Sequence, residues 1–178
     1  MKKICLLALL IACFVCGCDK ESENSITNVN GTTTIKQTIV ADDFDRNGSG
    51  MLKCTTEAEA DENIDVDLKY NVSYKNGNIL NLVSIQKVTS SEKESLDLYE
   101  NAYADIARHY AGLEHYNTDI VRDSNSVTYT ITINYNKIDI NKLLDIEGAE
   151  DNIIKNGKAN LSLWLDLAEG MGTVCEEA

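Results

Sequence analysis

The sequence predicts an α+β domain in which an antiparallel β-sheet, built from two hairpins plus an N-terminal strand, carries two helices on one face. Two patterns support this class. Apolar and polar residues alternate in segments that adjoin turn sequences, which is typical of β-hairpins. Another segment repeats apolar residues at helical spacing. Hairpins followed by separate helices pack as a sheet with helices to one side.

The first strand is expected over residues 51–57, with the sequence MLKCTTE. Apolar and polar residues then alternate over 66–74, which predicts a half-buried strand. The KNGN sequence at 75–78 supplies an Asn-Gly turn. The chain returns over 79–88 as a strand that is apolar on both faces, which completes the first hairpin.

A helix is expected after the first hairpin. Ser91 and Glu94 have the Ser-x-x-Glu spacing of a capping box, and Gly112 predicts the end of the helix. The apolar residues between them follow one stripe, which predicts packing on the sheet. The stripe consists of Leu96, Tyr99, Tyr103, Ile106 and Tyr110.

A second hairpin is expected from residues 116–122 and 127–135, followed by a short helical turn at 143–146. A second helix is expected over 161–171, with Asn160 or Ser162 as its N-cap. This helix is apolar on more than one side around Trp164. Either the whole run is buried, which is the favoured interpretation, or part of it contacts a partner.

The N-terminus has the layout of a secretory signal. MKK precedes an apolar run over residues 4–16, which is too short for a membrane span, and then comes Gly17-Cys18. A cysteine at this point resembles the bacterial lipobox, in which the thiol receives a diacylglyceryl group and becomes the new N-terminus. Cys18 is favoured because the apolar run ends there, and Cys13 is the alternative.

The sequence therefore divides into a signal peptide (1–17), a polar tether (18–34) and a single α+β domain (35–178). We expect the protein to be lipid-anchored on the extracytoplasmic face of the cell membrane. Cys54 and Cys175 then remain outside the cytosol, where a disulfide between them is expected. The alternative is two buried thiols in a reducing compartment.

Charge and missing motifs limit the function. The formal net charge of −13 disfavours nucleic acid as a partner. The sequence has no phosphate-binding glycine loop and no Gly-x-Ser-x-Gly motif, so we expect neither a cofactor nor catalysis.

Two weaker metal interpretations remain. Asp43, Asp45 and Asn47 match the first ligand positions of a calcium loop, but Cys54 replaces the glutamate that should close it. An acidic turn is therefore favoured over a calcium site. His109 and His115 are the only histidines and are the candidates for a metal-dependent or hydrolytic centre, although no spacing supports one.

The sequence also resembles the YehR-like small bacterial lipoproteins, a family without an assigned activity. The resemblance covers roughly residues 48–175. It implies an α+β lipoprotein domain with one cysteine in the first strand and another after a Gly-x-x motif, and it implies no catalytic residue. The similar segments are MLKCT, NVSYKNGNI, the helix with Tyr99 and Tyr103, NYNKIDINKL and DNIIKNGKANLSLWLDLAEGMGTVC.

These observations predict a binding or envelope-accessory protein. Its partners would be the membrane, through the lipid anchor, and an unidentified protein or small molecule. The alternatives are a small-ligand or divalent-metal binding lipoprotein and, with less support, a secreted hydrolase.

Overall fold

The computed structural model describes residues 45–61, 63–148 and 152–178. The elements in these ranges run in the order β1 (Ser49–Asp61), β2 (Ile64–Lys75), β3 (Asn78–Ser90), α2 (Lys93–His109), β4 (Tyr116–Arg122), β5 (Ser126–Asn134), α3 (Ile140–Glu147), β6 (Ile154–Lys155), β7 (Lys158–Ala159), α4 (Leu161–Gly170) and β8 (Val174–Glu177).

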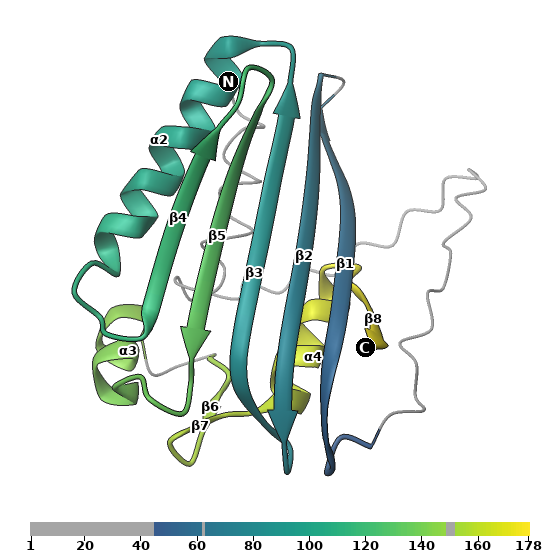
Figure 1. Cartoon of the computed structure of the whole chain (residues 1–178), viewed down its shortest axis with the longest axis vertical. Helices are drawn as coiled ribbons and strands as arrows, with labels where there is room; N and C mark the ends of the chain where they lie inside the picture. Colours follow the sequence, from purple (N-terminus) through teal and green to yellow (C-terminus); the bar gives the residue numbers. More distant parts are fainter. Residues whose placement is uncertain (1–44, 62, 149–151) are drawn as a thin grey trace, which may run out of the picture.

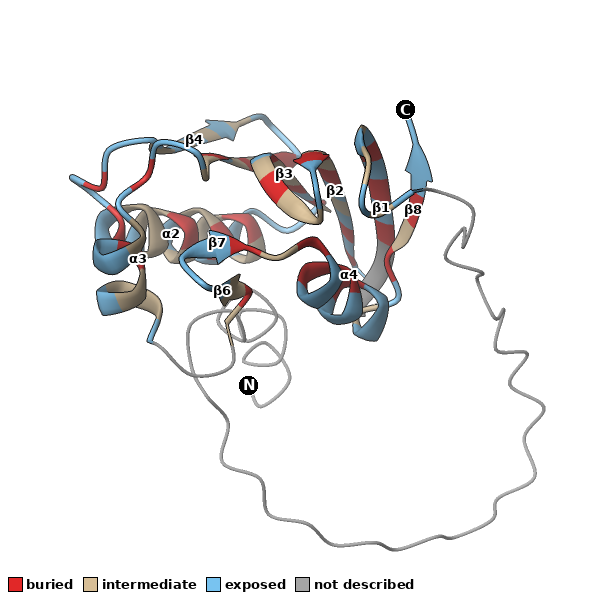
Figure 2. Cartoon of the chain, turned by 90° about the horizontal axis from the view of Figure 1, so that it is seen from below, coloured by how far each residue is buried: buried red, intermediate tan, exposed pale blue. Residues whose placement is uncertain are grey.

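The architecture is one large antiparallel sheet with helices on a single side. Its six strands have the order β4-β5-β3-β2-β1-β8, and every neighbouring pair is antiparallel (Figure 1). The helices α2, α3 and α4 all lie below the same sheet face, together with the small β6–β7 ribbon (Figure 2). The α+β class is therefore confirmed.

The details of the sheet differ from the prediction. β1 pairs with β2 along almost its whole length, so the expected N-terminal strand and first hairpin form one three-stranded meander. The C-terminal β8 adds an edge strand beside β1 that was not expected. Four residues are too few to show an alternating pattern in the sequence, so this strand could be recognised only from its pairing with β1.

The described residues also contain three helices, where two were expected. The short turn predicted at 143–146 is a complete helix, α3, because Asp139 caps it by accepting hydrogen bonds from the backbone N–H groups of Asn141 and Lys142. The capping box predicted for α2 is wrong. Its N-cap is Glu92, whose own N–H donates to the hydroxyl of Ser90.

The first hairpin turn and the start of α4 agree with the sequence. Asn76 and Gly77 both have positive φ, at 51° and 73°, as a two-residue hairpin turn requires. In α4, Asn160 is the N-cap and accepts from the N–H of Leu163.

The core lies between the sheet and its helices. Trp164 of α4 is 2% exposed and packs edge-on against Tyr70 of β2, with ring centroids 5.3 Å apart. The apolar run of α4 is split: Trp164 and Leu165 are buried, whereas Leu163 and Leu167 are exposed. The favoured interpretation, burial, is therefore confirmed for part of the run, and a partner contact at the exposed part stays a prediction. No helix in the described ranges is long and apolar enough to cross a bilayer.

Candidate functional site

The predicted disulfide is present. Cys54 of β1 and Cys175 of β8 lie directly opposite each other in the strand register, with Cα atoms 4.0 Å apart, and both are buried. The buried hydroxyls of Thr56 and Thr173 hydrogen-bond beside this bridge. The disulfide therefore fixes the C-terminal edge strand to the sheet.

The other predicted ligands give no assembled centre among the described residues. Cys13, Cys18 and Asp43 lie outside them. Asp45 forms a turn, because its side chain accepts from the N–H of Asn47 and its carbonyl accepts from the N–H of Gly48. In the described part of the chain, no three His, Cys, Asp or Glu side chains are grouped to hold a metal ion. The acidic turn remains the favoured interpretation, and the weaker calcium interpretation stays untested.

The two histidines lie near either end of the α2–β4 connection, and both are exposed. The ring of His109 contacts the edge of Tyr110, with centroids 5.8 Å apart. His115 has a φ of 70°, and its carbonyl accepts from the N–H of Asn134. These described contacts stabilise the connection and do not bring the two histidines together with a candidate nucleophile.

The sheet face opposite the helices is the first candidate site, and we call it the open face. No described element covers it (Figures 1 and 2). Because side chains alternate along each strand, the pairing registers define its members. Its uncharged members on β2, β3 and β5 are Asn71, Ser73, Asn81, Val83, Ile85, Thr128, Thr130 and Thr132, and the same registers place the charged Lys69, Lys87 and Asp119 directly beside three of them.

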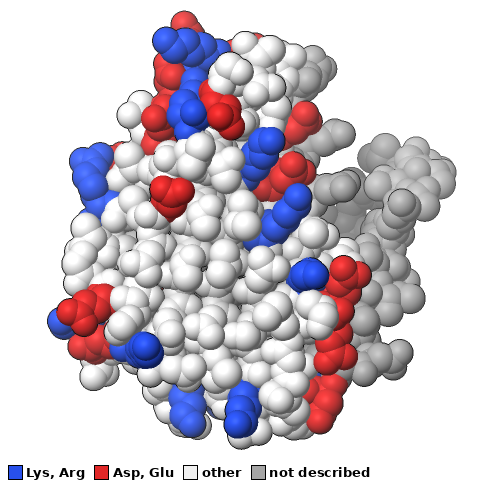
Figure 3. Space-filling view, in the orientation of Figure 1, with Lys and Arg blue, Asp and Glu red and all other residues white. Residues whose placement is uncertain are grey.

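The open face has an uncharged region, bordered by Lys69, Lys87 and Asp119, although the chain carries a formal net charge of −13. Figure 3 shows that most Lys, Arg, Asp and Glu side chains lie around its margins. The strand tyrosines, such as Tyr70, Tyr74 and Tyr129, are buried on the helix side. The open face of the described strands is therefore rich in hydroxyl, amide and small aliphatic groups and lacks aromatic rings.

A second candidate is a cluster of tyrosines around one carboxyl group on the helix side, which we call the tyrosine cluster: Tyr110, Tyr116, Tyr135 and Glu147. Tyr110, the C-cap of α2, stacks on Tyr116 of β4 with ring centroids 4.2 Å apart and planes 3° apart. The hydroxyl of Tyr110 donates to Oε1 of Glu147 at 3.2 Å. The cluster thus joins α2, α3 and the sheet.

Glu147 is a carboxyl group in an unusual environment for its type. Burial raises its pKa to about 7, and the hydrogen bond from Tyr110 offsets part of that rise. A carboxylate at the C-terminal end of a helix also meets the negative end of the helix dipole. This group could not be identified from the sequence, because its neighbours come from three other parts of the chain.

Two further tyrosines lie next to this cluster. The rings of Tyr103 and Tyr129 stack with centroids 4.8 Å apart, and both side chains are 1% exposed. Neither hydroxyl has a hydrogen-bond partner among the described residues. Buried hydroxyls without partners are uncommon and cost stability unless an ordered water satisfies them.

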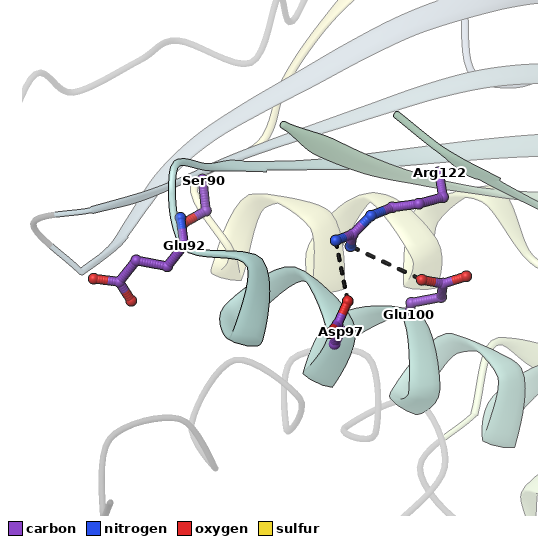
Figure 4. A network of polar contacts seen from close by, with 5 residues as sticks. All are labelled: Ser90, Glu92, Asp97, Glu100 and Arg122. Atoms are coloured by element: carbon purple, nitrogen blue, oxygen red, sulfur yellow. Dashed lines mark hydrogen bonds and ion pairs between the residues drawn. The ribbon is translucent and has the colours of Figure 1, made fainter. Parts of the chain in front are cut away.

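A polar network ties the edge strand β4 to α2 (Figure 4). Arg122 reaches Asp97 at 3.1 Å and Glu100 at 3.9 Å. The side chain of Arg122 is 23% exposed, whereas those of Asp97 and Glu100 are 49% and 43% exposed. This exposure indicates an ion pair at the surface.

These features define a class of protein: a disulfide-linked α+β domain whose antiparallel sheet has one open face. A solved NMR structure of the Escherichia coli YehR protein is similar, with a TM-score of 0.50 and 12% identity over 72% of this chain and 91% of that chain. An NMR structure of a Streptococcus pneumoniae protein has a TM-score of 0.44 and 14% identity, and covers 91% of this chain and 99% of that chain.

No protein-family model matches the chain, and no curated protein matches it. The likeness to the YehR structure supports a distant structural relationship and extends to the fold alone. It agrees with the sequence resemblance to that extent.

Proposed function

We propose that this protein is a lipid-anchored extracytoplasmic binding protein that recognises another protein through the open face and carries out no catalysis. The main supporting observation is an uncovered sheet face with an uncharged region in a strongly acidic chain. An exposed region without charge that is bordered by polar and charged groups is typical of interaction sites.

The composition of the open face favours a protein over other partners. A nucleic acid would need a basic surface, and the chain is acidic. An aromatic platform for stacking ligands is missing from the described strands on this side, because their tyrosines face the helices. Thr130 and Ile85, paired across β5 and β3, instead offer hydroxyl and aliphatic contacts suited to another protein surface.

The proposed location rests on two observations. The disulfide between Cys54 and Cys175 is of the kind that persists in oxidising, extracytoplasmic compartments. The N-terminal sequence has the layout of a lipoprotein signal with Cys18 as the acylation site. Together they support an anchored domain facing away from the cytosol.

The anchor is tested with two matched variants. Cys18→Ala is expected to move the protein from the membrane fraction to the soluble fraction, whereas Cys13→Ala is expected to leave it in the membrane. Mass spectrometry of the membrane form should show a diacylglyceryl group on an N-terminal Cys18. If Cys13→Ala alone releases the protein from the membrane, Cys13 is the acylated residue. An unmodified chain beginning at Met1 would refute the lipid anchor.

The binding surface is tested by site-specific photo-crosslinking in intact cells. A photoreactive residue at Thr130, in the centre of the open face, is expected to give a discrete protein adduct. The same residue at Ser162, which is exposed on α4 at the opposite side, is the control. Ile85→Glu should abolish the Thr130 adduct. No adduct at Thr130, or equal adducts at both positions, would refute the proposal.

A further inference from the structure

The C-terminal ends of two helices meet at Glu147. It is the last residue of α3, and its Oε1 accepts a hydrogen bond from Tyr110, the residue that caps the end of α2. The two residues are 37 positions apart in the chain, so this contact is tertiary. It joins α3 to the layer of stacked tyrosines that covers the sheet.

This site suits a protonated carboxyl and disfavours a carboxylate. In the described part of the chain no Lys, Arg or His forms an ion pair with Glu147, and Tyr110 is the described hydrogen-bond donor to it. One hydroxyl compensates poorly for removing a negative charge from water. The negative end of the α3 dipole adds to the penalty.

The groups around Glu147 from each neighbouring element are tyrosines. They are Tyr110 from α2, Tyr116 from β4, Tyr135 from the turn after β5 and, one ring further along, Tyr129 from β5. On α3 itself the charged Lys142 and Asp145 are exposed, as is His109 beside Tyr110. Glu150 and Asp151, which follow in sequence, lie outside the described residues.

We propose that Glu147 and Tyr110 form a proton-linked latch that holds the end of α3 on the tyrosine cluster while the carboxyl is protonated and releases it when the carboxyl ionises. The proposal is independent of the binding function of the open face. It makes the docking of α3 depend on the pH of the compartment in which the domain lies.

The direction of the pH dependence follows from the two states of Glu147. In the docked state burial raises its pKa to about 7, whereas a solvated glutamate has a pKa of about 4.3. Below about pH 4 both states are protonated and docking is at its strongest. As the pH rises, the released state loses its proton first, so docking weakens until the pH passes about 7 and is constant above that.

Hydrogen exchange of the α3 amides, corrected for the pH dependence of intrinsic exchange, tests the latch. Between about pH 5 and pH 8, the opening equilibrium of α3 in the wild-type protein is expected to rise on the order of a hundredfold relative to that in Glu147→Gln. Glutamine keeps the shape of the protonated acid and cannot ionise. Glu169→Gln, an exposed position on α4, is the control and should keep the wild-type response.

If the glutamine variant does not fold, an NMR titration of the Glu147 carboxyl in the wild-type protein tests the latch. Glu147 in the wild-type protein is expected to titrate near pH 7. Tyr110→Phe removes the hydrogen bond that lowers this pKa and should move the midpoint to higher pH. A wild-type midpoint near pH 4.3, or a pH response of α3 that persists in Glu147→Gln, would overturn the latch.

Discussion

Reducing the disulfide between Cys54 and Cys175 is expected to remove a large part of the stability of this domain. The cysteines are 121 residues apart, so the bridge closes nearly all of the described fold into one loop. The chain-entropy relation gives about 5 kcal/mol for a loop of this length, through restriction of the unfolded chain. Domains are stable by only about 5–15 kcal/mol, so the reduced protein should lie close to its unfolding transition.

Urea denaturation of the oxidised and fully reduced protein measures this difference. Reduction should lower the free energy of unfolding by about 5 kcal/mol and increase the dependence on urea, because the unfolded chain becomes more expanded. The double variant Cys54→Ala/Cys175→Ala is the control and should not respond to reductant. A loss below about 1 kcal/mol on reduction would refute the entropic argument, as would a double variant as stable as the oxidised wild type.

Four substitutions test the packing and the polar contacts, each by urea denaturation. Trp164→Ala should cost about 3–5 kcal/mol because its ring is 2% exposed, whereas Leu163→Ala on the exposed side of the same helix should cost less than about 1 kcal/mol. Equal losses would contradict the assigned faces of α4. Tyr129→Phe should be neutral or stabilising by up to about 1 kcal/mol, since its hydroxyl has no partner among the described residues. A loss above about 1 kcal/mol would reveal a bound water at that hydroxyl. Arg122→Met should cost less than about 1 kcal/mol, and the loss should shrink at high salt, because both carboxylate partners are well exposed. A larger, salt-independent loss would count against a surface ion pair.

The strands with long alternating patterns could be predicted from the sequence, and the short elements could not. The pattern over 66–74 predicted β2, which the structure places at Ile64–Lys75. β8 has four residues, and its assignment depends on pairing with β1. The start of α2 was misplaced because Ser91 fits a capping pattern, while the structure uses the hydroxyl of the preceding Ser90. Local patterns cannot distinguish between adjacent serines.

The disulfide could be predicted from the sequence, whereas the tyrosine cluster could not. Cys54 and Cys175 could be paired because the expected compartment left two cysteines that need a partner. Glu147 could not be identified, because its sequence context is that of an ordinary amphipathic helix. Its high pKa arises from burial where α3 meets α2, β4 and the turn after β5, and the hydrogen bond from Tyr110 offsets part of the rise. Such a site exists only once tertiary packing brings these segments together.

The open face and the core depend on one strand register. β3 lies between β2 and β5, and its pairing places Ile85 opposite both Lys69 and Thr130. A slip of one residue in β5 would turn Thr130 toward the helices and bring the buried Tyr129 to the open face. Burial of the tyrosines therefore selects the register, and the same register assembles the uncharged region of the open face from three strands. A substitution that weakens the tyrosine packing should consequently disturb partner binding even though no tyrosine of the described strands lies on that face.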